Sequence, residues 1–241
     1  MEADAFVVID VLRATTTIAT MFEQGLDDLL VLDDLAAART RAVAEQRLLF
    51  GEVGGLRPEG FDHGNSPVEA EALQLRGQRA ALFTTNGTRA LCGVAGRGVV
   101  AAAAFANLTA AGHWAAAFAQ VVLVCAGESG GTRFALEDFA AAAGMVHLLK
   151  RESPGLVLGD AAGVAAALPG YEDLTAESVP HESGRIARLL AGAEHGRALL
   201  ALGLGLGLAS DTAFAAREDT SGAVPVVVER GEGWARLRDE R

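Results

Sequence analysis

The sequence predicts an α/β protein with a three-layer α/β/α arrangement around a mostly parallel or mixed sheet. Short apolar segments typical of buried strands alternate with Ala-rich segments at helical spacing over residues 6–150, as successive βαβ units do. Hydrophobic residues make up 51% of the 241 residues and aromatic residues only 5%. That composition suits small side chains packed closely on both faces of a sheet.

The first predicted strand is the apolar run 6–9, which ends at Asp10. A carboxylate at the carboxyl end of a buried parallel strand faces the crevice where α/β sheets bind ligands. Arg13, Thr15 and Thr16 follow at the start of a helix predicted over 15–24, and helix N-termini bind anions. We interpret this stretch as a site for a metal-bound phosphate. Taken alone, Asp10 is equally well explained as a helix N-cap or a turn residue.

The elements that follow are a strand, a helix and a second strand, predicted at 29–32, 35–45 and 48–50. Glu52 is a second carboxylate at a strand end. The glycine-rich stretch after it has no periodicity, and Asp62, Asn65 and Ser66 can donate to or coordinate a ligand there. The SPVE sequence that starts at Ser66 also matches a capping box with proline at the first helical position. Capping and ligand binding therefore both remain open for Ser66.

A polar loop follows the next predicted strand, 80–83, and leads into a helix that begins near Ala90. The loop residues are Thr84, Thr85, Asn86, Gly87 and Thr88. A strand, a Gly- and Thr-containing loop and a helix have the form of a phosphate-binding loop, although the lysine of a Walker A motif is absent. We favour binding of phosphate or carboxylate over a simple turn.

Further elements are predicted as a strand at 99–104, a helix at 107–118, a strand at 121–125 and a helix at 136–150. Cys125 ends the third of these, and Gly127 follows it in a glycine-containing loop. This cysteine is more typical of a small buried hydrophobe than of a thiolate nucleophile. Glu137 and Asp138 occupy the first turn of the last helix, where they either stabilise the helix dipole or bind a metal.

Beyond residue 150 the pattern is mostly helical, with helices predicted at 161–168, 183–193, 197–202 and 211–217 and a strand at 224–228. Pro225 indicates that this strand lies at a sheet edge. We interpret His181 and His195 as surface or capping residues rather than catalytic bases. The alternating Gly and Leu of 203–208 follow a helix, so they are not a dinucleotide-binding motif. No linker divides the chain, and we expect one domain over 1–241, with a subdivision near 150 left open.

The formal net charge of −11 argues against a nucleic-acid partner, because phosphate backbones are bound by clustered Lys and Arg. A small anionic substrate remains compatible if arginines or a divalent cation offset the overall charge. We expect no membrane partner and a cytoplasmic protein, because we find neither a signal segment nor an apolar run of roughly 18 residues. Two cysteines are too few for a disulfide scaffold. The Ala-rich helices would permit close subunit packing, which leaves a homo-oligomer open.

Five motifs along the chain are IDVLRATTT at 9–17, GFD with GNSP at 60–67, TTNGT at 84–88, CAG at 125–127 and LED at 136–138. In order and spacing they resemble the motifs of the 2-phosphosulfolactate phosphatase family, Mg²⁺-dependent acid phosphatases of coenzyme M biosynthesis. The resemblance covers nearly the whole chain. It implies a three-layer α/β/α fold, a Mg²⁺ cofactor and hydrolysis of the phosphate monoester of a 2-hydroxy acid.

The expected site residues fall into three groups. Those expected to be catalytic are Asp10, Arg13, Glu52 and Asp62, with Asp10 either the nucleophile or the principal metal ligand and Glu52 and Asp62 further ligands or the base for water. Those expected to bind phosphate or substrate are Thr15, Thr16, Asn65, Ser66, Thr84, Thr85, Asn86, Gly87, Thr88, Cys125 and Gly127. The expected metal ligands are Asp10, Glu52, Glu137 and Asp138.

Three functions remain open. They are a phosphatase for small 2-phospho-carboxylates such as 2-phosphosulfolactate, a phosphatase for another small phosphate ester, and a non-catalytic protein that binds an anionic metabolite. The carboxylates favour an enzyme, because an anion binder gains nothing from Asp10, Glu52 and Asp62 around a phosphate. The chain also departs from the family pattern twice. It begins almost at the first strand, which puts an edge strand or part of the pocket in question, and the Gly-Leu repeat near Gly203 resembles an insertion of roughly one helical turn.

Overall fold

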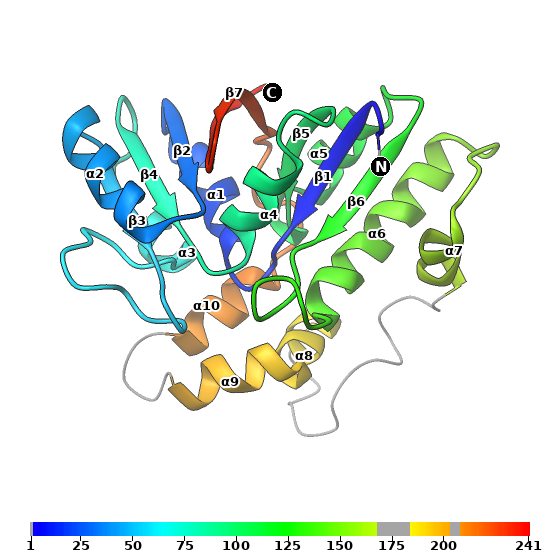
Figure 1. Cartoon of the computed structure of the whole chain (residues 1–241). Helices are drawn as coiled ribbons and strands as arrows, with labels where there is room; N and C mark the ends of the chain where they lie inside the picture. Colours follow the sequence, from blue (N-terminus) through cyan, green and yellow to red (C-terminus); the bar gives the residue numbers. More distant parts are fainter. Residues whose placement is uncertain (1, 168–183, 203–207) are drawn as a thin grey trace.

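A mixed sheet of eight strands forms the centre of the described structure, and it confirms the predicted α/β class (Figure 1). The computed structural model describes residues 2–167, 184–202 and 208–241. The strand order is β3-β4-β2-β8-β7-β5-β1-β6. β2, β3 and β4 form one parallel group, β1, β5 and β6 form another, and the antiparallel β7 and β8 lie between them.

The elements lie close to their predicted positions. The strands are β1 (Ala5–Ile9), β2 (Asp28–Leu32), β3 (Leu48–Gly51), β4 (Arg79–Phe83), β5 (Val99–Ala103), β6 (Val121–Cys125), β7 (Pro225–Gly231) and β8 (Trp234–Asp239). The helices are α1 (Ala14–Glu23), α2 (Leu35–Glu45), α3 (Pro67–Glu71), α4 (Gly87–Val94), α5 (Leu108–Ala115), α6 (Leu136–Glu152), α7 (Asp160–Ala167), α8 (Arg185–Gly192), α9 (Glu194–Leu202) and α10 (Leu208–Ala215), with a 3₁₀ turn at Phe105–Asn107.

Alternating side chains of the strands place apolar residues on both faces of the sheet. In β1, Phe6 and Val8 belong to the core cluster that includes Ile18 of α1, whereas Val7 and Ile9 belong to the cluster that contains the buried face of α6. In β2 the residues likewise alternate between the α1 side and the α2 side. The sheet is therefore the middle of three layers, with α1, α3 and α4 on one face and α2, α5 and α6 on the other.

The strand that contains Pro225 lies inside the sheet, so the expectation of an edge strand was wrong. β7 lies between β8 and β5. Its pairing with β5 is confined to Ala101 and Val226. Pro225 has no N–H to donate, and it is tolerated here because so few backbone hydrogen bonds join β7 to β5. β8, which pairs with β2 and β7, had no predicted counterpart.

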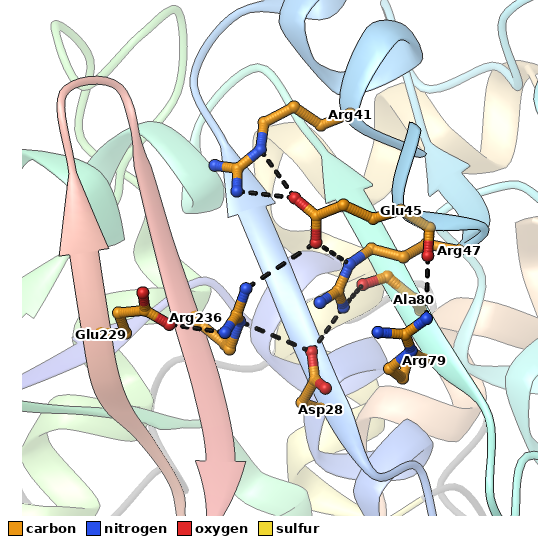
Figure 2. A network of polar contacts seen from close by, with 8 residues as sticks. All are labelled: Asp28, Arg41, Glu45, Arg47, Arg79, Ala80, Glu229 and Arg236. Carbon is orange, nitrogen blue, oxygen red and sulfur yellow. Dashed lines mark hydrogen bonds and ion pairs between the residues drawn. The ribbon is translucent and has the colours of Figure 1, made fainter. Parts of the chain in front are cut away.

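An ionic network joins β8 to the other strands at the amino ends of β2, β3 and β4 (Figure 2). Arg47, whose side chain is 1% exposed, pairs with Asp28 and Glu45. Arg236 of β8 reaches the same two acids, at 3.8 and 3.7 Å. These contacts connect the hairpin formed by β7 and β8 to the parallel group of β2, β3 and β4. They lie at the amino ends of the strands, whereas the predicted site lies at the carboxyl ends.

Candidate active site

Polar residues from the carboxyl ends of several strands surround a cavity of about 210 Å³. Those that line it are Asp10 after β1, Glu52 after β3, Thr84, Thr85 and Asn86 after β4, Glu128 and Ser129 after β6, and Arg13, Asn65 and His195. α9 adds Ala198, Leu199 and Leu202 to the lining. In Figure 1, α8, α9 and α10 lie at the end of the sheet toward which β1 and β6 point. The cavity thus lies between the strand ends and the C-terminal helices.

Asp10 is buried with one carboxylate oxygen engaged and one free. Oδ1 accepts a hydrogen bond from the Ala14 N–H at 3.1 Å, and no residue of the described chain donates to Oδ2. The Thr15 hydroxyl accepts from the Asp10 N–H and donates to the Asp10 carbonyl oxygen, which fixes the turn before α1. Burial raises the pKa of Asp10 to about 6, despite the hydrogen bond from Ala14 and the nearby His195. Asp10 thus accepts from the first N–H of α1 through one oxygen and keeps the other without a donor in the described structure.

The Thr84–Thr88 loop brings the first turn of α4 against Asp10. Thr84 and Thr88 bond to each other's backbone and side-chain groups, so their hydroxyls hold the loop closed. Gly87 begins α4, and a Cβ there would stand 2.6 Å from Asp10 Oδ2. The N–H groups of the first turn of a helix have no partner within the helix and attract anions. The loop therefore offers anion donors beside the free oxygen of Asp10.

Glu52 holds two loops of the cavity together. Its Oε1 accepts from the backbone N–H and the hydroxyl of Thr85, each at 2.8 Å, and its Oε2 accepts from the Gly55 N–H at 2.8 Å. Both oxygens are thus engaged by the protein. This geometry suits a residue that positions the Thr84–Thr88 loop.

Arg13 is held beside the cavity by an acid that sequence reasoning did not single out. Its Nη1 lies 2.7 Å from Oδ2 of the buried Asp211 in α10, and its Nη2 donates to the Gly55 carbonyl oxygen at 2.7 Å. The Ser66 hydroxyl donates to Asp211 Oδ1 and also accepts from the Glu69 N–H as the cap of α3. The neighbouring Asn65 is buried with no hydrogen-bond partner for Oδ1 in the described structure.

Asp138 fastens α6 to the strand ends. Its Oδ1 accepts from the Val11 N–H at 2.9 Å and its Oδ2 from the Gly127 N–H at 3.0 Å. Burial, together with the charges of Asp10 and Glu137, raises the pKa of Asp138 well above its usual value. The part of Gly127 seen in the structure is therefore its backbone N–H, which donates to Asp138. Both carboxylate oxygens of Asp138 are engaged.

Glu137, Glu128 and His195 come together from three parts of the chain. His195 Nδ1 lies 3.4 Å from Glu137 Oε1, and one ligand atom from each of the three residues lies within 4.8 Å of the others. Burial alone would lower the pKa of His195, but Glu137, Asp10 and Glu128 raise it above its ordinary value. The expectation that His195 is a surface or capping residue between two helices was wrong, because it lies inside α9 and faces the cavity.

The donor set fits a divalent cation. Glu137 is 1% exposed and its Oε2 has no partner among the described residues. Besides burial, the charges of Asp10 and Glu137 raise the pKa of Asp138, and those of Glu52 and Glu137 raise the pKa of Asp10. A buried cluster of carboxylates with free oxygens costs free energy that a bound cation offsets. Asp10 and Glu137 are the predicted ligands with an oxygen left over, whereas Glu52 and Asp138 are already engaged.

The predicted residues that do not line the cavity are Thr15, Thr16, Asp62, Ser66, Gly87, Thr88, Cys125, Gly127, Glu137 and Asp138. Three of them have contacts elsewhere in the fold. Asp62 is exposed, and its Oδ2 accepts from the Leu49 N–H at 2.8 Å. Thr16 is buried and donates to the Val11 carbonyl oxygen. Cys125 lines a different, mainly apolar cavity of about 690 Å³ beside α6 and α7, and burial, with the charges of Asp138 and Glu137, raises the pKa of its thiol to about 12. His181 and the Gly-Leu repeat of 203–207 lie outside the described residues.

Sequence reasoning missed four polar residues of the site: Glu128, Ser129, His195 and Asp211. Glu128 follows β6 closely, so the strand-end signal that pointed to Asp10 and Glu52 could have found it. Asp211 and His195 lie on α10 and α9, where no local pattern separates them from surface residues.

No helix in the described ranges combines the length and the apolarity needed to cross a bilayer.

Comparisons with known proteins agree on one family. The family model described as 2-phosphosulpholactate phosphatase matches residues 1–230. A probable 2-phosphosulfolactate phosphatase of Thermotoga petrophila is 34% identical over 228 residues, which are 95% of this chain and 91% of that protein. Proteins of the same description from Deinococcus radiodurans and Synechococcus sp. JA-3-3Ab are 37% and 38% identical, over 93% of this chain and 88% and 89% of theirs.

Proposed function

The chain belongs to the 2-phosphosulfolactate phosphatase family, and from this premise we propose that it hydrolyses the phosphate monoester of a small 2-phospho-carboxylate with the aid of Mg²⁺. The observation that carries the proposal is the contact between Asp10 and Gly87. It places a free carboxylate oxygen beside the first turn of α4, whose backbone donors suit a phosphate. Phosphoryl transfer to a carboxylate requires that the carboxylate and the donors that bind the phosphate lie next to each other. Asp10 and the amino end of α4 meet this requirement.

Phosphate binding in this proposal uses donors that the protein has not already engaged. In the first turn of α4 the Thr88 N–H is held by the Thr84 hydroxyl, which leaves the N–H groups of Gly87 and Arg89. The Asn86 side chain lines the cavity. A guanidinium has five N–H donors, and the contacts of Arg13 with Asp211 and Gly55 leave others for an anion. These groups would bind the phosphate oxygens and stabilise the charge of the transferring phosphoryl group.

Asp10 is the proposed nucleophile. Oδ2 would attack phosphorus, the bond from phosphorus to the ester oxygen would break, and the released 2-hydroxy acid would take a proton from water. Attack of water on phosphorus then breaks the bond to Asp10, which releases phosphate and restores the carboxylate. Glu52 acts through the Thr85 loop that it holds, so we propose it as a positioning residue. Asp62 has no part in this scheme, because it lies outside the cavity.

The residues proposed to hold Mg²⁺ are Asp10, through the remaining lone pair of Oδ1 so that Oδ2 stays free to attack, and Glu137, whose Oε2 has no partner in the described structure. When bound, Mg²⁺ would offset the negative charge on the phosphate oxygens. The volume of the cavity, about 210 Å³, favours a small phosphate ester such as 2-phosphosulfolactate over a nucleotide.

The test measures phosphate release from 2-phosphosulfolactate, 2-phospholactate and phosphoglycolate, with and without Mg²⁺, by the wild type and by Asp10→Asn. We expect Mg²⁺-dependent release that the substitution abolishes. Borohydride reduction of the quenched wild-type reaction should convert phosphorylated Asp10 to homoserine, which mass spectrometry detects. Release by Asp10→Asn at the wild-type rate would contradict the assignment of the nucleophile. Binding of all three esters without release would favour the non-catalytic function.

A further inference from the structure

Arg89 carries a positive charge that has no partner in the part of the chain that the structure describes. It is exposed in the first turn of α4, and its guanidinium makes no hydrogen bond, ion pair or ring contact with the described residues. The first turn of α4 contains no acid. The dipole of a helix repels a cation at the helix N-terminus, so the position of Arg89 becomes favourable only when an anion binds beside it.

The guanidinium of Arg89 lies at the rim of the active-site cavity. A Cβ built on Gly130 would lie 3.2 Å from Arg89 Nη1, so the guanidinium packs over the backbone of this glycine in the loop after β6. The Gly130 N–H donates to Asn86 Oδ1 at 2.8 Å. Asn86 and Ser129, the neighbours of Arg89 and Gly130 in this contact, both line the cavity. Residues three apart share a face of a helix, which places Arg89 on the same side of α4 as Asn86.

The charges within the cavity are unfavourable for a substrate with two anionic groups. The ionisable residues that line the cavity are Asp10, Arg13, Glu52, Glu128 and His195. The charge of Arg13 is offset by the buried Asp211 at 2.7 Å, and His195 faces Glu137 at 3.4 Å. A phosphate ester that also carries a carboxylate or sulfonate therefore meets more acids than unpaired cations there. Arg89 supplies a positive charge at the rim.

We propose that Arg89 binds the second anionic group of the substrate, a carboxylate or sulfonate next to the phosphate ester, and so selects small esters that carry such a group. This inference rests on the proposed function and deepens it, because it concerns which esters the site prefers. The guanidinium suits the task, since its planar fork of N–H donors matches a carboxylate.

One turn of α4 would thus bind both anionic parts of the substrate. The free backbone N–H groups of Gly87 and Arg89 face the phosphate in the proposed function, and the Arg89 side chain extends from the same turn. In a 2-phospho-carboxylate the carboxylate is attached to the carbon that carries the ester oxygen. The two anionic groups of the substrate are therefore as close to each other as the two sets of donors.

A solvated surface arginine is the competing explanation of Arg89. The chain offers such a residue for comparison, because Arg97 is also exposed and its side chain has no partner among the described residues. Arg97 follows the carboxyl end of α4, where the helix dipole favours a cation. Arg97→Gln therefore changes the net charge as Arg89→Gln does, but at the other end of the same helix.

The test compares three esters that differ in their second anionic group. 2-Phosphosulfolactate carries a carboxylate and a sulfonate, 2-phospholactate carries only the carboxylate, and isopropyl phosphate carries neither. We expect Arg89→Gln to raise the KM for 2-phosphosulfolactate by about tenfold or more, while kcat and the KM for isopropyl phosphate stay within about twofold of the wild type. Arg89→Lys should regain part of the loss, because it keeps the charge without the fork. Arg97→Gln should match the wild type with all three esters.

The result with 2-phospholactate identifies the group that Arg89 binds. A rise in KM as large as that for 2-phosphosulfolactate would support the proposal with the carboxylate as the bound group, and no rise would support it with the sulfonate. An equal loss with isopropyl phosphate would overturn the proposal, because Arg89 would then act on the phosphate or on the fold. An unchanged KM for 2-phosphosulfolactate would overturn it as well.

Calorimetry separates this inference from the proposed function. The three esters are titrated, with Mg²⁺ present, into Asp10→Asn and into the double variant Asp10→Asn, Arg89→Gln, which measures binding without turnover. If the wild type released no phosphate from any ester, the proposed function would fail. Weaker binding of 2-phosphosulfolactate, but not of isopropyl phosphate, to the double variant would still support the role of Arg89, and equal binding of each ester to the two variants would refute it.

Discussion

Gly87 leaves room for nothing larger than hydrogen between the first turn of α4 and Asp10. A Cβ at this position would lie 2.6 Å from Asp10 Oδ2 and 2.5 Å from the Cβ of Ala14, distances that real Cβ atoms do not show. The approach joins a loop from one parallel group of strands to an acid from the other. The proposed reaction depends on this contact, because the α4 donors and Asp10 must reach the same phosphate.

Replacement of Gly87 by alanine should therefore abolish most of the activity. The methyl group has to displace either α4 or the Asp10 side chain, and a misplacement of about 1 Å costs on the order of 100-fold in rate. The measurement is kcat/KM for phosphate release, with circular dichroism to show folding. Gly93→Ala in the same helix is the control, since a Cβ there meets no atom within 4 Å. If Gly87→Ala and Gly93→Ala lowered kcat/KM equally, the close approach of Gly87 to Asp10 would not be the cause of the loss.

Asp10→Asn should make the metal-free protein more stable at neutral pH. The folded pKa of Asp10, about 6, lies above the ordinary aspartate value of 3.8, so the folded state binds the proton more tightly than the unfolded state. The contribution of Asp10 to the free energy of unfolding is therefore greatest below pH 4 and is lost as the pH rises through 6 and Asp10 ionises. The asparagine side chain carries no charge at any pH. The free energy of unfolding of Asp10→Asn should therefore exceed that of the wild type by about 2–3 kcal/mol above pH 7 and equal it at pH 4.

Urea unfolding in EDTA at pH 4 and pH 7.5 measures this gain. Asp34→Asn serves as control, because Asp34 also accepts a helix N–H, from Ala37 at 2.7 Å, but is exposed. A gain for Asp10→Asn that is the same at both pH values would rule out burial of the charge as its cause.

Arg13→Ala should destabilise the fold as well as the site. Its partner Asp211 has a side chain that is 1% exposed, and loss of one member of a buried pair typically costs about 3–5 kcal/mol. The double variant Arg13→Ala, Asp211→Asn should regain much of that loss, because it removes the unpaired charge. Urea unfolding of the four proteins in the cycle measures the coupling.

The exposed pair of Arg217 and Glu71, with side chains 52% and 49% exposed, gives the comparison for this cycle. Exposed pairs contribute at most about 1 kcal/mol. If the Arg13 cycle gave a coupling as small as this one, the buried pair would have no special part in stability.

Arg47→Met should lower stability while leaving the kcat of the folded protein unchanged. The substitution leaves the buried Asp28 with only the more distant Arg236, in the network at the far end of the strands (Figure 2). We expect a loss of about 3 kcal/mol, measured by urea unfolding. Arg79→Gln, which removes one exposed hydrogen bond to the Glu45 carbonyl oxygen, should stay within about 0.5 kcal/mol. A drop in kcat for Arg47→Met would show that the network supports the cavity.

The parts of the fold and site that the sequence could predict are those with local signals. The alternation of apolar and Ala-rich segments predicted the parallel strands, and the position after a strand predicted that Asp10, Glu52 and Thr84 line one cavity. Asp62 was predicted from a weaker signal, its place in a glycine-rich loop, and its carboxylate accepts from the Leu49 N–H instead of facing the cavity. A loop without periodicity does not specify the direction of its side chains.

The remaining features depend on contacts between distant segments. Asp211 and His195 reach the site only because α9 and α10 pack over the strand ends. The place of Pro225 inside the sheet follows from the short ladder between β7 and β5, which no composition rule reveals. Such tertiary contacts override local preferences.

The hairpin of β7 and β8 lies in the middle of the sheet although it is the last part of the sheet to be synthesised. β8 pairs with β2 and β7 with β5, so the strands of the two parallel groups have no ladder between them until residues 225–239 are made. A nascent chain, which emerges from its amino end, therefore holds two half-sheets whose inner edges are open templates for aggregation. Asp10 belongs to one half and the Thr84–Thr88 loop to the other. The hairpin thus supplies the backbone ladder between the half that carries Asp10 and the half that carries the Thr84–Thr88 loop, and the proposed reaction needs both halves.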